Sequence, residues 1–269
     1  MKNLMLVIGM LCIICLGFVN AENHTKTTGN VSAGNEPSRL VKQLLINDDG
    51  WQKRIVDFEY DESGRLVAVS TTYNAETESE FTEKATVTYG NGTIVCEGSK
   101  KKLTLRLDSD GFVKEEKRIY EDSVIEVHYK YNSGKLGSCG LRKYFWDGDN
   151  ITKMTAVLCD EDLIWYDTIE YKYSDVVCPS IDILAFSGMF GSFLGAESVA
   201  SKGIVSKYMP SEVKVSNYDG EGALNSVSLL TCNYNTDKYG RIESFDYKHS
   251  RHNGSIFEDN TNVSVKVVY

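Results

Sequence analysis

Catalytic motifs are missing from this sequence of 269 residues. It contains no H-E-x-x-H, no G-x-S-x-G, no Walker phosphate loop and no G-x-G-x-x-G that opens a helix. Its four histidines are scattered rather than grouped: His24, His128, His249 and His252. The sequence therefore names no catalytic residue, no metal ligand and no cofactor, and we expect a non-enzymatic protein. A serine or cysteine nucleophile assembled from distant residues stays open as an alternative.

Positive charge is also in short supply. The chain has 29 Lys and Arg against 38 Asp and Glu, a formal net charge of -9 and a pI near 5.1. Without a basic face, a protein cannot neutralise nucleic-acid phosphates or dock on anionic lipid. The one basic run, Lys100 to Lys102, precedes a predicted strand and is typical of a solvated sheet edge. We therefore expect no nucleic-acid partner.

Cysteines are few, and their spacing does not suggest pairs. Once the first 21 residues are removed as described below, five remain: Cys96, Cys139, Cys159, Cys178 and Cys232. No C-x-x-C pair survives among them, which argues against zinc and redox sites. An odd number leaves at least one cysteine outside any intramolecular disulfide. If one bridge forms, Cys178 with Cys232 is the predicted pair, because it would join an apolar insert to the sheet.

A long apolar run occurs only at the start, from Leu4 to Val19, after Met1-Lys2-Asn3 and before Asn20-Ala21. This order predicts a signal peptide over residues 1–21, because the apolar run is shorter than the ~20 residues of a spanning helix. An uncleaved anchor and a lipoprotein are the alternatives. Residues 22–39 are polar and aperiodic, as in a disordered tether. Residues 40–269 then form a single domain of an exported protein, in the periplasm or on the cell surface.

What the sequence does contain is a repeated hairpin pattern. Phe58 to Val69 reads as strand, tight turn and strand around Asp61 and Gly64, and a close variant runs from Tyr234 to Phe245. Val56, Phe58 and Tyr60 alternate with polar residues before the turn, and Leu66, Ala68 and Ser70 share one predicted face after it. Looser copies surround Gly90-Asn91-Gly92, residues 108–111, Asn132-Ser133-Gly134 and residues 147–150. Turns at this spacing predict an all-β antiparallel meander that forms a barrel or a strongly curved sheet.

The pattern changes after Cys178-Pro179-Ser180. Residues 181–196 are apolar and Gly-rich without strand alternation, so we expect a short apolar helical insert near 181–206. A membrane helix is the alternative, disfavoured by Asp182 and the short length. Residues 249–260 are predicted to form a polar loop, and residues 261–269 a closing strand.

Two further features have both a functional and a structural interpretation. The acidic turns at 108–111 and 147–150 offer oxygen ligands for calcium but lack the downstream ligands of an EF-hand loop, so turn chemistry is favoured. The 16 tyrosines and 3 tryptophans could form a sugar-stacking platform, although strands favour aromatic residues in any case.

The hairpin motif Tyr60-Asp61-x-x-Gly64-Arg65-Leu66 resembles the YD repeat of RHS-type proteins. The wider order of hairpins, apolar insert, Tyr208-Met209-Pro210 and final hairpin resembles a Bacteroidetes family of exported proteins of unknown function with a porin-like fold. This resemblance implies a curved or closed antiparallel sheet and transfers no catalytic residue. The turns at residues 90–92 and 132–134 lack the Tyr-Asp pair, which leaves strand number and closure open.

Three functions follow as hypotheses. The first is an exported, non-enzymatic binding or envelope-associated module that takes a lipid or a glycan on its concave face, partly filled by the insert. The second is an integral outer-membrane barrel; the charges on both faces of residues 112–120 argue against it, because a lipid-facing strand has an apolar face. The third is a glycan-active enzyme with paired carboxylates, which composition alone cannot support.

Overall fold

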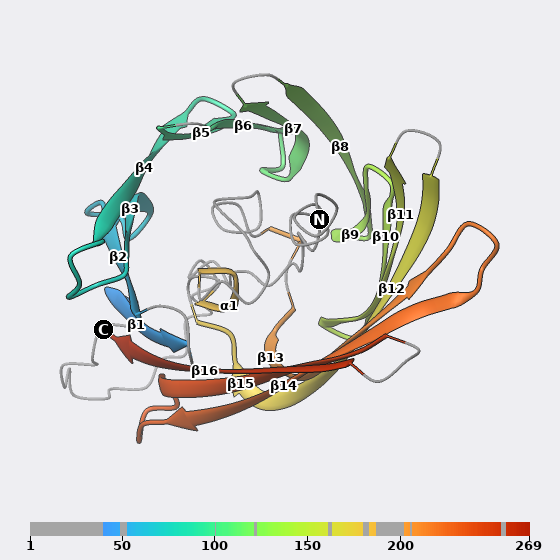
Figure 1. Cartoon of the computed structure of the whole chain (residues 1–269). Helices are drawn as coiled ribbons and strands as arrows, with labels where there is room; N and C mark the ends of the chain where they lie inside the picture. Colours follow the sequence, from blue (N-terminus) through green and yellow to red (C-terminus); the bar gives the residue numbers. More distant parts are fainter. Residues whose placement is uncertain are drawn as a thin grey trace, which may run out of the picture.

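The computed structural model of the chain is a closed antiparallel barrel of sixteen strands (Figure 1). It describes residues 40–48, 53–99, 101–120, 123–160, 163–179, 183–186, 202–204, 206–253 and 257–269. The predicted all-β barrel is confirmed, and the alternative of an open curved sheet is excluded. The predicted signal peptide and tether lie outside the described residues.

The strands follow one another around the barrel in chain order. Their bounds are β1 Gln43–Asp48, β2 Lys53–Tyr60, β3 Leu66–Tyr73, β4 Phe81–Gly90, β5 Thr93–Gly98, β6 Lys101–Leu107, β7 Val113–Tyr120, β8 Val124–Asn132, β9 Lys135–Cys139, β10 Arg142–Asp147, β11 Asn150–Asp160, β12 Leu163–Val177, β13 Tyr208–Tyr218, β14 Leu224–Thr236, β15 Ile242–Asn253 and β16 Phe257–Val268. Each pairs with its sequence neighbours, and β1 closes the barrel against β16 from Gln43–Val268 to Asp48–Val263.

A layer of buried apolar side chains runs around the whole inner face. Every strand contributes at least one buried apolar side chain to a single hydrophobic cluster. One buried residue from each strand in order is Leu44, Val56, Leu66, Val87, Ile94, Leu105, Val113, Tyr129, Leu136, Tyr144, Ile151, Ile169, Val213, Leu230, Phe245 and Val265. In this layer, the period-two alternation of the sequence places the apolar residues inside and the polar residues outside.

The barrel has two unlike ends. The turn end carries the connections after the even-numbered strands, most of them short turns, and the loop end carries those after the odd-numbered strands. At Asp61 the carboxylate Oδ1 accepts the backbone N–H groups of Ser63 and Arg65 at 3.0 and 2.9 Å, and Gly64 has a φ of 78°. Since this φ favours glycine, the D-x-x-G motif determines the conformation of the turn. The same carboxylate bonds recur at Asp108, Asp219 and Asp237.

A ring of inward side chains lies near the turn end, one from each even-numbered strand or its end. Its members are Tyr60, Tyr89, Leu107, Tyr131, Trp146, Tyr173, Tyr234 and Tyr269, all packed against the core. Several donate a hydrogen bond to a backbone carbonyl on the preceding strand or just before it, as Tyr89 does to Leu66 at 3.1 Å and Tyr234 to Pro210 at 2.7 Å. Burial raises the pKa of Tyr89 to about 12. The ring ties neighbouring strands together where the sequence repeat places its tyrosines.

Two predictions about local structure were wrong. A β-bulge between Glu59 and Tyr60 shifts the register, so Leu66 and Val69 share the inner face while Ala68 pairs with Glu59 on the outside. The predicted loop at 249–260 is strand in its described residues, since β15 runs to Asn253 and β16 begins at Phe257. A bulge and a strand extension cannot be read from alternation alone.

The predicted disulfide is also wrong, because Cys178 and Cys232 do not bridge. Cys232 lies on β14, Cys178 follows β12, and β13 runs between them. Two inter-strand spacings of about 4.8 Å separate their backbones by more than a disulfide spans.

The predicted helical insert is present in part. One short helix, α1 (Ile183–Phe186), lies inside the ring of strands (Figure 1). The rest of 181–206 lies outside the described residues apart from 202–204 and 206. Across the described ranges, no helix has the length and apolar character needed to cross a membrane.

Candidate functional site

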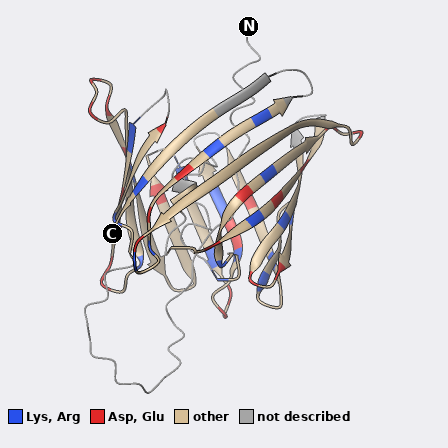
Figure 2. Ribbon diagram, turned by 90° about the horizontal axis from the view of Figure 1, so that it is seen from below, with Lys and Arg blue, Asp and Glu red and all other residues tan. Residues whose placement is uncertain are grey.

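The outer face is held together by charge pairs between strands. Lys117 of β7 pairs with Glu126 of β8 at 2.8 Å, and Lys172 of β12 pairs with Glu212 of β13 at the same distance. Further outer pairs are Lys84–Glu59, Lys102–Glu97, Arg106–Glu115 and Lys214–Glu170. Figure 2 shows that Lys, Arg, Asp and Glu lie along the strands and not only at their ends. The outer surface is therefore suited to water.

The inner face near the turn end is dry. Leu105 and Leu136 are fully buried although they line a sixteen-stranded wall, so other parts of the molecule cover them. Ile183 and Leu184 of α1 are fully buried in the same cluster. Burial also raises the pKa of the Cys96 thiol to about 12, an effect that the nearby Glu116 carboxylate reinforces. This half of the interior is a packed core.

A strap formed by residues 202–204, 206 and 207 crosses the turn end. Its partners there lie in or directly after three successive turns: the carbonyl oxygen of Asp110, the backbone N–H of Leu136 at the start of β9 and the carbonyl oxygen of Asp149. Gly203 accepts the Leu136 N–H at 2.6 Å, and its φ of 73° allows a close approach to Gly134 and the Phe112 ring. The strap thus links the β6–β7, β8–β9 and β10–β11 connections.

Ser206 forms the buried anchor of this strap. Its hydroxyl accepts the backbone N–H of Ile151 at 3.0 Å and lies 2.7 Å from the Tyr173 hydroxyl, which donates to the Ile151 carbonyl at 2.6 Å. Because buried polar groups need partners, the triangle fixes the strap to the wall of β11 and β12.

One charged cluster lies on the inner wall of β7 and β8. Glu116 is fully buried, accepts a hydrogen bond from the Tyr129 hydroxyl at 2.5 Å, and forms an ion pair with Arg118. Arg118 is 19% exposed, so this pair marks the level at which the inner face changes from apolar to polar. A buried carboxylate without these partners would be costly.

Above that level, toward the loop end, the inner wall is half-exposed and polar. The inward side chains there combine charged, amide and aromatic groups: Arg54, Tyr73, Phe81, Glu83, Lys101, Tyr120, Arg142, Trp165, Asp167, Asn217, His249 and Arg251. Burial raises the pKa of Asp167, although the Asn217 amide donates a hydrogen bond to its carboxylate at 2.7 Å. We take this polar inner wall as the candidate functional site.

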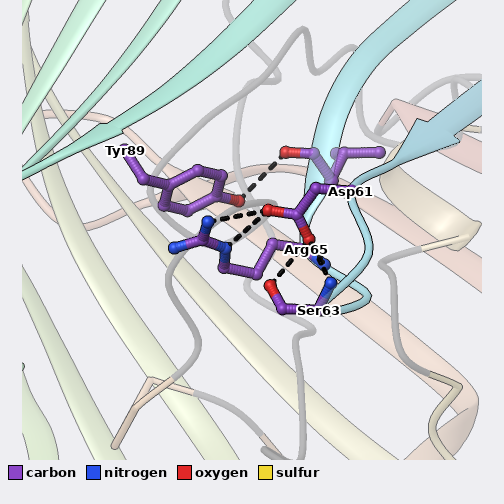
Figure 3. Close-up of polar contacts among 5 residues, drawn as sticks. Asp61, Ser63, Arg65 and Tyr89 are labelled. Carbon is purple, nitrogen blue, oxygen red and sulfur yellow. Dashed lines mark hydrogen bonds and ion pairs between the residues drawn. The ribbon is translucent and has the colours of Figure 1, made fainter.

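The repeated Asp–Arg pairs at the turn end serve structure. Arg65 donates to the second carboxylate oxygen of Asp61 at 2.8 Å through Nε, and its guanidinium lies 4.6 Å from the centre of the Tyr89 ring (Figure 3). The Ser63 hydroxyl and the Arg65 backbone N–H hold the pKa of Asp61 well below its usual range. The second copy, Asp237, Arg241 and Tyr269, repeats the pair and the stacking distance.

The residues singled out from sequence do not converge on one site. His128 and His252 are exposed on the outer face, whereas His249 points inward on β15. The Asp108 carboxylate accepts two backbone N–H groups, which supports its interpretation as a turn residue. No group of three potential metal ligands occurs among the described residues. Sequence reasoning missed the polar inner wall because its members are set by register across many strands.

Several solved structures resemble this barrel, including two porin-like proteins. A porin-like protein from Bacteroides uniformis matches with a TM-score of 0.55 at 12% identity, over 86% of this chain and 97% of that one. A porin-like protein from Bacteroides vulgatus matches with a TM-score of 0.53 at 13% identity, over 85% of this chain and 98% of that one. No protein-family model and no curated protein matches the sequence. The comparisons thus agree with the porin-like fold that the sequence resemblance implied.

Proposed function

We propose that this chain is an exported, water-exposed barrel of the cell envelope that binds a ligand on the polar inner wall at its loop end, and that it does not conduct solutes. The binding function rests on the half-exposed polar groups of that wall, since the rest of the inner face is already covered.

The observation that carries the proposal is the polarity of the two faces. A membrane-spanning barrel presents an apolar band to lipid and, as a pore, a polar lumen to water. Here the inner face is apolar and buried near the turn end and polar only toward the loop end, and the outer face carries charge pairs such as Lys117–Glu126. A Lys or Arg on the lipid face near the bilayer midplane costs about 2–4 kcal/mol, and several strands would carry that cost.

The second candidate is an integral outer-membrane barrel, and the comparisons favour it over the binding module because both similar structures are described as porin-like. Apolar outer side chains also support it: Phe145, Ile164 and Tyr166 are 48%, 48% and 40% exposed on β10 and β12. Charged outer residues border them, since Lys153 and Glu170 occupy the same face of β11 and β12. The apolar patch therefore does not form a band around the barrel.

Extraction separates the two candidates. Residues 22–269 are exported to the periplasm of a Gram-negative host, and soluble and detergent-extracted fractions are compared. We expect the protein in the soluble fraction as a folded barrel with strand-type circular dichroism. Folded protein found only after detergent extraction would reject the water-exposed barrel and select the membrane candidate. A planar-bilayer conductance measurement completes the test, because stable single-channel steps would contradict the filled interior.

A further inference from the structure

An exposed pair of stacked aromatic rings lies on the inner face at the loop end. Tyr73 ends β3, Phe81 begins β4, and the two are direct partners across the strands. Their ring centres are 4.8 Å apart with an angle of 13° between the planes. Phe81 is 51% exposed, although burying such a side chain stabilises a fold by about 1.5–3 kcal/mol. The chain thus holds a flat apolar surface in contact with water.

The loop that joins the two rings is ordered in advance of any ligand. Lys53 forms an ion pair with Glu76 at 2.5 Å, and its carbonyl accepts the Ala75 N–H at 3.0 Å. The Glu76 N–H in turn donates to the Glu80 carboxylate at 2.8 Å. Glu76 has a φ of 69°, a strained conformation that persists only where neighbouring contacts impose it. A preformed platform loses little entropy on binding.

Charged groups border the rings on the same face. Glu83 lies two residues after Phe81 on β4, and Arg54 lies on the adjoining β2. Both act on the Tyr73 hydroxyl: burial raises the pKa of Tyr73, the Glu83 carboxylate raises it further, and the Arg54 guanidinium opposes the shift. A carboxylate accepts and a guanidinium donates hydrogen bonds, so hydroxyl groups of either role find a partner here.

We propose that the Tyr73–Phe81 pair, with Glu83 and Arg54 at its edge, is a carbohydrate-binding site. A sugar ring has an apolar C–H face that stacks on an aromatic ring, and a rim of hydroxyl groups that need both donors and acceptors. An acyl chain fits less well, because it would displace water from the Glu83 carboxylate without offering it a hydrogen-bond donor. This inference rests on the proposed binding function and assigns its ligand class.

The test uses residues 22–269 and three soluble probes: maltohexaose, cellohexaose and chitohexaose. Affinity is measured by isothermal titration calorimetry for the wild type and for Phe81→Ala, Phe81→Trp and Phe145→Ala. Phe145 is the matched control, because it is 48% exposed but lies on the outer face of β10. Melting temperatures of all variants check the fold.

We expect at least one probe to bind the wild type, and Phe81→Ala to weaken it by about tenfold, the loss of roughly 1.4 kcal/mol of stacking and contact. Phe81→Trp and Phe145→Ala should bind within about twofold of the wild type, since the first keeps a flat ring and the second is remote. No binding by any probe, or equal weakening in both alanine variants, would overturn the assignment. Palmitate binding that depends on Phe81 while the sugars do not bind would replace it with a lipid site.

The result of the sugar titrations can be distinguished from the result of the extraction experiment that tests the proposed function. If the protein needs detergent, the same titrations run in a non-ionic detergent whose headgroup lacks sugar. Sugar binding there would support the site while the water-exposed barrel fails, and a soluble protein that binds no sugar would do the reverse.

Discussion

The turn end and the loop end of the barrel differ in what their polar and apolar groups contact. At the turn end, Asp61 binds its own turn and Arg65, and the hydroxyl of Tyr173 binds the strap. At the loop end, Leu141 and Leu224 are 63% and 55% exposed, and the inward polar groups are half-exposed. One end uses its side chains to close the fold, whereas the other leaves them accessible. The difference indicates that stability resides mainly at the turn end, and it supports our proposal that a ligand binds at the loop end.

The largest expected effect comes from the strap. At Gly203→Ala, the added methyl group would overlap the Gly134 carbonyl and lie 2.8 Å from the Phe112 ring, in a backbone conformation with a φ of 73°. We expect a loss of about 3 kcal/mol in the free energy of unfolding, measured by urea titration. Gly222→Ala, at the loop end, is the control: its φ is 86° but nothing lies within 4 Å, so about 1 kcal/mol is expected. Equal losses would show that the strap contributes no packing.

Removing one hydroxyl tests the same end more gently. Tyr173→Phe deletes the hydrogen bonds to the Ile151 carbonyl and the Ser206 hydroxyl, and we expect a loss of about 1–2 kcal/mol by urea unfolding. Tyr166 lies on the same strand, β12, but on its outer face, where it is 40% exposed. Tyr166→Phe should therefore change the free energy of unfolding by less than about 0.5 kcal/mol. A larger effect at Tyr166 would mean that the outer face is not water-exposed.

The shared turn gives a direct comparison of the ends. Asp237 at the turn end and Asp219 at the loop end each accept the backbone N–H groups of the second and fourth residues that follow them. Of the two, only Asp237 also binds an arginine side chain, that of Arg241 at 2.7 Å. Asp237→Ala should therefore lower the melting temperature more than Asp219→Ala does. Calorimetric scans of the two variants decide, and the reverse order would show that Arg241 adds nothing to the turn.

The smallest effect is a difference in pH dependence. The pKa of Asp61 is lowered by the Ser63 hydroxyl and the Arg65 backbone, so its contribution is complete above the usual pKa near 3.9 and is lost as the pH falls through the lowered value. Asp61→Asn should make acid unfolding less steep. Burial raises the pKa of Asp167, so that residue costs stability as the pH rises from the usual pKa through the raised one. Asp167→Asn should be stabilising at neutral pH and equal to wild type in acid.

Urea titrations over a pH series measure both variants. A destabilised Asp167→Asn protein at neutral pH would show that its hydrogen bond with Asn217 outweighs the cost of burying the charge.

The sequence predicts the strands and turns well because both are local. Asp61 and Gly64 carry the chemistry of their turn, and Val265 and Val267 alternate as the closing strand requires. The sequence predicted either a closed barrel or a strongly curved sheet, because the alternation of apolar and polar residues does not show whether the first and last strands pair. The bulge before Tyr60 turns Ala68 outward and Val69 inward. The strand propensities of these two apolar residues do not show which of them faces the core.

The candidate site could not be predicted because it depends on register between strands. Tyr73 and Phe81 lie on either side of a polar loop, and only their pairing makes them a platform. Arg54 joins them from a third strand. No spacing in the sequence marks such a group, whereas the Asp–Arg pairs at the turn end, four residues apart, are visible at once but serve structure.

The single long-range pairing, β1 with β16, has a consequence for how the protein folds. Every other strand pairs with the next strand along the chain, most of them across short turns, but β1 must wait for the last strand of the chain. Until then both sheet edges are unpaired and can join other chains. We therefore expect refolding yield to fall with protein concentration, and deletion of β16 to produce aggregates rather than a smaller barrel.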